Sequence, residues 1–186
     1  MVRFTIVLIP LCLVLTITAT GHAVEEDSAM TITSPAFDSG QRIPTHYTGE
    51  GQDVSPPLQW SDPPDGVKQF AMIVDDPDAP TAEPWVHWVI YSLPPNLTSL
   101  PEAVPRDAQL TDPPGAMQGL NSWPSNNVGY RGPMPPPGHG MHHYYFTLYA
   151  LDQALDLEPR MTKAELLRAI DGHVLETAEL IGTYER

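Results

Sequence analysis

Apolar and aromatic residues gather in short runs, and clusters of Pro, Gly, Asn and Asp separate these runs. Runs rich in β-branched and aromatic residues predict strands at residues 69–75, 86–92 and 143–151, and a weaker strand at 30–34. Residues 60–66, which contain two prolines and a glycine, are predicted to form a loop. The pattern therefore predicts a mostly β protein.

One helix is predicted near the end of the sequence, because Thr162 and Glu165 have the spacing of a capping box. Apolar residues then recur at helical spacing, namely Leu166, Leu167, Ile170, Val174, Leu175 and Ala178. Gly172 weakens this helix, and Gly182 is predicted to end it. A second, short helix is predicted at residues 153–157.

Length and composition favour one domain without long helices. The chain has 186 residues, of which 22 are proline, and proline interrupts helix interiors. Its 23 acidic and 9 basic residues give a net charge of −14, which argues against binding nucleic acid or anionic membrane surfaces. Residues 121–140 lack any periodic pattern, and a loop of that length is usually either functional or disordered.

The first 23 residues have the pattern of a secretory signal peptide. Arg3 supplies the positive charge, an apolar stretch follows, and Gly21 and Ala23 have the spacing that signal peptidase recognises. The alternative is an uncleaved membrane anchor, but an apolar run of about 16 residues is short for a membrane span. We therefore predict a signal peptide at residues 1–23 and a single exported domain at 24–186, periplasmic or secreted.

Cleavage would also change the chemistry of the chain. The only cysteine, Cys12, lies in the predicted signal peptide, so the remaining chain would contain no thiol, disulfide or cysteine–metal site. Losing Arg3 would change the formal charge from −14 to −15.

Candidate chemistry begins with two carboxylates between prolines. Pro77 and Pro80 keep the residues before them extended, so Asp76 and Asp78 are expected to project to a similar side. His87 lies near the start of the next predicted strand. The alternatives are that the carboxylates only form a turn and that His87 is a core histidine.

A second polar segment precedes and enters the third predicted strand. Glycines and prolines make residues 129–140 a stiff loop with small side chains, and His142 and Tyr144 then share one strand face. Imidazole, phenol and backbone N–H groups can donate to a small anion, and nearby carboxylates would favour protonated histidine. His139 and His143 are more simply explained as solvent-exposed residues.

These motifs resemble the phosphatidylethanolamine-binding proteins, and within them the bacterial and archaeal Raf-kinase-inhibitor-like branch. The first matching motif is DDPDAP at 75–80 with HW at 87–88. The second is GPMPPPG at 132–138 with HHY at 142–144. The resemblance extends over nearly all of the chain after the predicted signal peptide.

The resemblance implies a large central antiparallel sheet, a smaller sheet packed on it, and a C-terminal helix. It also implies a pocket for small anions and phospholipid head groups, in which His87 and Tyr144 donate to the anion beside backbone N–H groups near Met134. The implied pocket residues are Asp76, Asp78, Pro80, Trp85, His87, Gly132, Met134, Pro136, His142 and Tyr144. No cofactor is implied, and a homodimer is expected because this branch is often dimeric.

Three functions follow as hypotheses. The first is an exported, non-catalytic protein that binds a small anionic ligand or phospholipid head group and modulates an unidentified protein partner. The second is phosphoester hydrolysis, metal-assisted or acid–base, by Asp76, Asp78, His87 and His142. The third is an extracytoplasmic protease inhibitor that acts through a surface loop, as relatives imply.

Overall fold

The structure, a computed structural model, describes residues 1, 29–125 and 127–186. The predicted signal peptide lies outside these residues except for Met1. In chain order the strands are β1 Thr31–Thr33, β2 Leu58–Ser61, β3 Gln69–Asp76, β4 Trp85–Leu93, β5 Ser99–Leu100, β6 Met117–Gln118, β7 His142–Leu151 and β8 Val174–Tyr184. The helices are a 3-10 turn at Thr45–Tyr47 and α1 at Lys163–Ile170. None of the helices found in the described ranges is long and apolar enough to cross a membrane.

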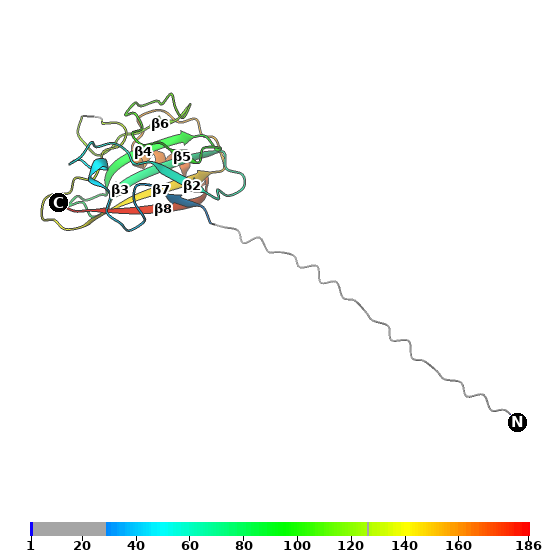
Figure 1. The fold of residues 1–186 in the computed structure, drawn as a ribbon. Coiled ribbons are helices and arrows are strands. Elements are labelled where there is room, and N and C mark those ends of the chain that lie inside the picture. The colour runs from blue at the N-terminus through cyan, green and yellow to red at the C-terminus, as the bar shows by residue number, and fades with distance from the viewer. Residues whose placement is uncertain (2–28, 126) are drawn as a thin grey trace.

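The described strands form two antiparallel sheets, as predicted (Figure 1). The larger sheet has the strand order β6-β4-β3-β7-β8, and the smaller sheet has the order β1-β2-β5. The four strands predicted from residue patterns are confirmed as β1, β3, β4 and β7, each within one residue at either end. Two sheets and one helix near the end of the chain match the fold that the resemblance implied.

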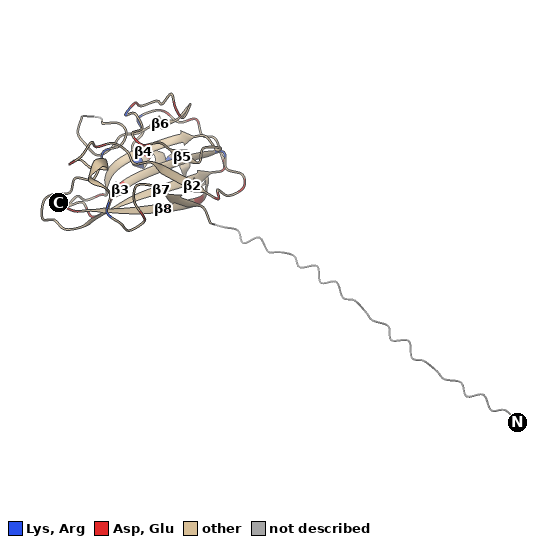
Figure 2. Cartoon of the chain, in the orientation of Figure 1, with Lys and Arg blue, Asp and Glu red and all other residues tan. Residues whose placement is uncertain are grey.

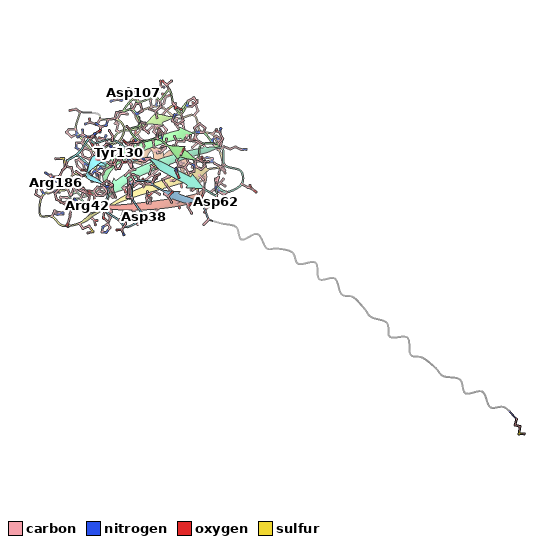
Figure 3. The ribbon with its side chains drawn as sticks, viewed as in Figure 1. Asp38, Arg42, Asp62, Asp107, Tyr130 and Arg186 are labelled. Carbon is pink, nitrogen blue, oxygen red and sulfur yellow. The ribbon has the colours of Figure 1, made fainter. Side chains whose placement is uncertain are left out.

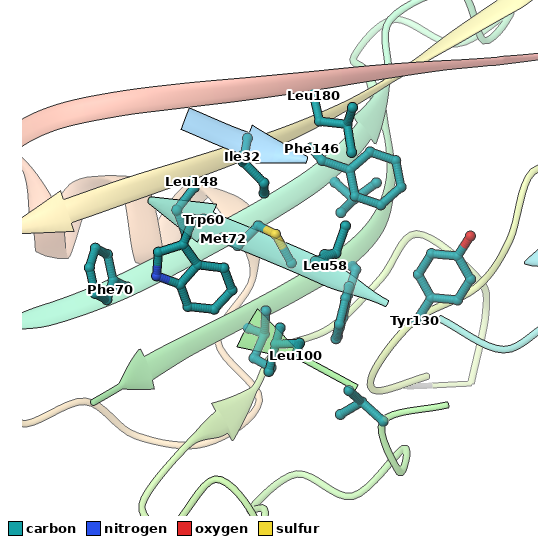
Figure 4. Packing of buried hydrophobic residues seen from close by; sticks show 14 of the residues in the cluster. Ile32, Leu58, Trp60, Phe70, Met72, Leu100, Tyr130, Phe146, Leu148 and Leu180 are labelled. Carbon is teal, nitrogen blue, oxygen red and sulfur yellow. The ribbon is translucent and has the colours of Figure 1, made fainter. Parts of the chain in front are cut away.

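Strand β3 is at the centre of the larger sheet and is buried on both faces. Phe70, Met72 and Val74 belong to the core between the two sheets, where Figure 4 shows Met72 beside Leu58 of β2. Ala71 and Ile73 point to the other face and pack in a second core with residues of α1. Burial on both faces explains why this strand is a continuous apolar run and not an alternating one.

The predicted long helix is wrong beyond Ile170. The capping box of Thr162 and Glu165 is present, and α1 ends where Gly172 adopts a φ of +79°. The chain then forms β8, which pairs with β7 along nearly its whole length. Apolar residues of this segment fit a helical pattern only in part. The alternation that buries Ala178 and Leu180 also fits a strand, and pairing with β7 selects the strand.

Two smaller predictions are also corrected. Residues 153–157 form no helix, and the loop predicted at 60–66 begins two residues later, because β2 extends to Ser61. The described residues of 121–140 contain no helix and no strand beyond an isolated bridge between Leu120 and Val128. This stretch is therefore a long loop, as predicted.

Charged residues lie mostly on the loops around the sheets, as Figure 2 shows. The exceptions that matter here are Asp75 and Asp76 at the end of β3. A carboxylate at the end of a buried strand loses solvation, which must be balanced by hydrogen bonds or ionic partners. The partners of Asp76 define the site described next.

Candidate functional site

Three strand ends bring the predicted site together. β3 ends at Asp76, whereas its antiparallel neighbours β4 and β7 begin at Trp85 and His142. These three strand ends therefore lie side by side at one end of the sheet. Asp76 is directly opposite Trp85 in the register of β3 and β4. A cavity of about 410 Å³ opens at this end of the sheet. Its lining residues are Asp76, Ala79, Pro80, Thr81, Trp85, His87, Trp123, Met134, Pro135, Pro136, His142, Tyr144 and Arg186.

His87 is the extra residue of an irregularity in the pairing of β3 with β4, because Val74 pairs with Trp88 and Asp75 with Val86. Such irregularities reorient side chains. Arg131 holds His87 at two points, since the Arg131 N–H donates to the His87 carbonyl at 2.9 Å and His87 Nδ1 lies 2.6 Å from the Arg131 carbonyl.

This geometry places a proton on Nδ1, because a carbonyl oxygen can only accept. The pKa of the ring then decides whether Nε2 is protonated as well. Burial lowers the pKa of His87 to about 4, and the hydrogen bond to Arg131 offsets only part of that effect. The expectation of a protonated, donating His87 is therefore wrong for this residue, because burial outweighs the nearby carboxylates.

Tyr144 lies against His87, with ring centroids 5.0 Å apart and an interplanar angle of 89°. Its side chain is buried, and its hydroxyl makes no hydrogen bond of normal geometry among the described residues, although the Asp76 carboxylate lies close enough to interact with it. Burial raises the pKa of the Tyr144 hydroxyl, and the Asp76 carboxylate raises it further through its charge and its acceptor oxygens, so the group remains a donor. Tyr144 lines the cavity, so a ligand there is the candidate partner for this hydroxyl.

Asp76 and His142 form a buried acid–base pair. His142 Nδ1 lies 2.7 Å from Asp76 Oδ2, and His142 Nε2 lies 2.7 Å from Nδ1 of the exposed His139. The other carboxylate oxygen, Oδ1, accepts from the backbone N–H of Asp78 at 2.9 Å. Burial raises the pKa of Asp76, and the hydrogen bond from His142 opposes that shift only in part.

Two of the ten predicted site residues do not line the cavity. Asp78 points to His143, whose backbone N–H and Nδ1 lie 2.8 and 2.7 Å from Asp78 Oδ2. Burial favours a higher pKa for Asp78, but the bonds from His143 together lower it. The N–H of Gly132 donates to Asp53 Oδ1 at 2.7 Å, and a Cβ at Gly132 would lie 2.2 Å from the Tyr47 carbonyl oxygen. Gly132 therefore permits close backbone packing behind the site.

Asp53 organises this packing, and the sequence analysis did not identify it. Its Oδ2 lies 2.9 Å from Arg131 Nε and 2.8 Å from an Arg106 nitrogen, while Oδ1 holds Gly132. Asp53 thus fixes the segment whose carbonyl sets the protonation of His87. In the sequence it directly precedes the segment VSPPLQW at residues 54–60, and this position was the only available signal.

Trp123 and Arg186 complete the cavity and were also missed. The Trp123 ring lies 5.4 Å from that of Trp85 and 5.0 Å from that of His87. Arg186 Nε lies 3.1 Å from a Glu50 carboxylate oxygen, at the end of the molecule labelled in Figure 3. The length of the 121–140 loop pointed to the segment that holds Trp123, whereas no pattern pointed to Arg186.

The arrangement offers no evident metal site. Within residues 29–125 and 127–186, no group of three or more His, Cys, Asp or Glu side chains is placed to hold a metal ion. The lining residues can form hydrogen bonds through neutral and charged side chains, and aromatic and proline rings form an apolar wall beside them.

Comparison with known proteins agrees with this fold. Residues 33–185 match the model of the family described as phosphatidylethanolamine-binding protein. A UPF0098 protein of Methanothermobacter thermautotrophicus is 49% identical over 157 residues, which are 84% of this chain and 99% of the relative. A UPF0098 protein of Chlamydia trachomatis is 44% identical over 161 residues, which are 84% of this chain and 99% of the relative.

Two solved structures have the same fold. A crystal structure described as a putative phosphatidylethanolamine-binding protein homologue from Chlamydia trachomatis is 44% identical, with a TM-score of 0.74 over 85% of this chain and 98% of that one. Escherichia coli YbcL, described as a new member of the mammalian PEBP family, is 34% identical, with a TM-score of 0.77 over 86% of this chain and 99% of that one. The two packed sheets and the likeness to these structures therefore define the fold class of the phosphatidylethanolamine-binding protein family. The chain belongs to the phosphatidylethanolamine-binding protein family. The names of these relatives state no enzymatic activity.

Proposed function

We propose that this protein is exported and binds, without turnover, the anionic group of a small ligand such as a phosphate head group. The observation that carries the proposal is the buried Tyr144 hydroxyl, which makes no hydrogen bond of normal geometry among the described residues and lines the cavity. A site that desolvates a hydroxyl without satisfying it loses stability, and a ligand oxygen would restore the missing hydrogen bond.

The cavity suits a ligand with a polar end and an apolar part. Asp76, His87 and Tyr144 converge at the strand ends, while Trp85 and Trp123 form part of an apolar wall. Its volume of about 410 Å³ falls within the range of small-molecule sites. Such a ligand would place its oxyanion against the polar groups and its carbon atoms along the rings.

Titration followed by NMR tests this proposal. Phosphate, phosphoethanolamine and acetate are added separately, and the ring signals of His87, His142 and Trp123 are followed. Trp60, which is buried in the core between the sheets and does not line the cavity, is the internal control. The proposal expects saturable shifts at the three cavity residues and none at Trp60. Unchanged cavity signals at millimolar concentrations of all three ligands would refute it.

Hydrolysis is the alternative that the same samples can test. A general base needs a free nitrogen or oxygen near the substrate, but both ring nitrogens of His142 already have partners, Asp76 and His139. His87 Nε2 would be the remaining base. Phosphomonoester or phosphodiester turnover that disappears in His87→Gln would favour the enzyme, whereas binding without turnover favours the proposal.

A further inference from the structure

The base of the cavity presents both hydrogen-bond acceptors and a hydrogen-bond donor, and this combination specifies the ligand more closely. His87 presents Nε2, because Nδ1 is held by the Arg131 carbonyl at 2.6 Å. The neutral ring offers one lone pair to the cavity and no proton. The side chain is 2% exposed, so a ligand that covers Nε2 without donating to it would leave a buried acceptor unpaired, which is costly.

Asp76 is the second acceptor that lines the cavity. Its carboxylate is held by one donor on each oxygen, His142 Nδ1 on Oδ2 and the Asp78 N–H on Oδ1. A carboxylate offers about four acceptor positions, so accepting capacity remains. Its charge also repels an anion that brings no hydrogen. The charged and titratable side chains that face this space are Asp76, His87, His142, Tyr144 and Arg186.

Tyr144 supplies a side-chain donor at the base, and Arg186 is the cation of the lining. A ligand that can only accept hydrogen bonds would satisfy Tyr144. Its oxygens would also face two other acceptors, His87 Nε2 and Asp76, to which it could not donate. A ligand that carries both an ionised oxygen and a hydroxyl would satisfy all three groups. Acid phosphates and phosphonates have this combination, whereas sulfate, sulfonates and phosphodiesters lack the hydroxyl.

We infer that the cavity selects oxyanions that carry a proton of their own, such as hydrogen phosphate or a monoprotonated phosphate monoester, and discriminates against fully ionised oxyanions and phosphodiesters. This inference rests on the proposed function, because it specifies the ligand of the same site. It makes the ligand's hydroxyl, and not only its negative charge, the feature that is recognised.

A matched pair of ligands tests the inference on the full chain. At about pH 5, methylphosphonate and methanesulfonate have the same shape and a single negative charge, but only the phosphonate carries a hydroxyl. Calorimetry is expected to show the phosphonate binding about 10- to 100-fold more tightly, the ratio that one buried unsatisfied acceptor typically produces. Methyl phosphate, whose second ionisation lies near pH 6, should likewise bind more tightly than dimethyl phosphate.

Variants and nitrogen shifts identify the group responsible. Tyr144→Phe should weaken both members of the pair and leave their ratio unchanged, whereas His87→Phe should lower the ratio. The ¹⁵N shift of His87 Nε2 in the unaltered protein should show an unprotonated nitrogen that accepts a hydrogen bond when methylphosphonate is added. This measurement does not depend on whether His87→Phe folds.

The outcomes separate this inference from the proposed function. Equal binding of methylphosphonate and methanesulfonate, or a protonated Nε2 in the complex, overturns the selectivity but leaves anion binding intact. Failure of every oxyanion to bind overturns both.

Discussion

The Tyr144 hydroxyl is expected to matter for ligand binding and not for stability. Because the group makes no hydrogen bond of normal geometry among the described residues, its removal should cost the folded protein little. For Tyr144→Phe we expect a free energy of unfolding that is unchanged or raised by up to about 1 kcal/mol, while phosphate affinity falls at least about tenfold. Thermal unfolding and calorimetry measure the two quantities.

Tyr149→Phe is the matched control, because Tyr149 lies on the same strand but does not line the cavity. Its phosphate affinity should equal that of the unaltered protein. Equal losses in the two variants, or no loss in Tyr144→Phe, would contradict the role assigned to the Tyr144 hydroxyl.

His87 makes stability depend on pH in a defined direction. Its pKa is about 4 in the folded protein and near the ordinary value of 6.5 in the unfolded chain. Between these values the unfolded state binds a proton that the folded state does not, so stability falls as pH falls through this window. The loss contributed by this residue is about 3 kcal/mol from pH 6.5 to pH 4.

Urea unfolding of the unaltered protein and of His87→Gln across this pH range checks the expectation. The difference between their stabilities should shift in favour of the variant as pH falls. The raised pKa of Asp76 acts in the opposite direction, but Asp76 is present in both proteins. A constant difference between pH 4 and pH 7 would show that His87 is not held neutral.

The residues of the site could be named from sequence more readily than their chemical states. Motifs in two segments indicated Asp76, His87, His142 and Tyr144, and the structure places all four around one cavity. The protonation of His87 could not be predicted, because burial in the folded sheet keeps the ring neutral and a carbonyl 44 positions away in the chain places its proton on Nδ1. Local sequence carries no record of that contact.

At the scale of elements, the strands could be predicted where the apolar pattern fitted a buried strand and no other element. β3, β4 and β7 are long, apolar and bounded by turn residues, so their limits followed from the sequence. β8 was misread because its apolar residues continue the helical spacing of α1. Only pairing with β7, which is distant in sequence, decides between helix and strand. β8 is therefore specified by its pairing with β7 and not by its own residues alone.

Substitutions at two glycines in this region test why the helix–strand junction and β8 require glycine. Gly172 has a φ of +79° with open space around it, whereas a Cβ at Gly182 would lie 2.4 Å from Ile43 Cγ1. Gly172→Ala should therefore cost about 1 kcal/mol through backbone strain. Gly182→Ala should cost about 1–3 kcal/mol through overpacking.

Asparagine separates the two mechanisms in chemical unfolding experiments. Asn tolerates the left-handed conformation, so Gly172→Asn should be milder than Gly172→Ala. The larger side chain should make Gly182→Asn worse than Gly182→Ala. The reverse order at either position would mean that the assigned cause is wrong.

At the scale of the whole molecule, the site depends on the sheet and not on either motif alone. The end of β3 and the start of β7 are more than sixty positions apart, and antiparallel pairing brings them together. The excess of 23 acidic over 9 basic residues then disfavours anions at long range. Recognition must consequently come from groups inside the cavity, which is consistent with a ligand that is small and partly protonated.

Export is the last expectation at this scale. If residues 1–23 are a signal peptide, a bacterial host that expresses the full sequence should yield a product that begins at Val24 in its extracytoplasmic fraction. Intact-mass measurement identifies that start. Arg3→Glu reverses the positive charge ahead of the apolar segment and should slow processing, whereas Glu25→Gln, beyond the predicted cleavage position, should not. A cytoplasmic product that retains residues 1–23 would refute export and would place the cavity among cytoplasmic phosphate compounds.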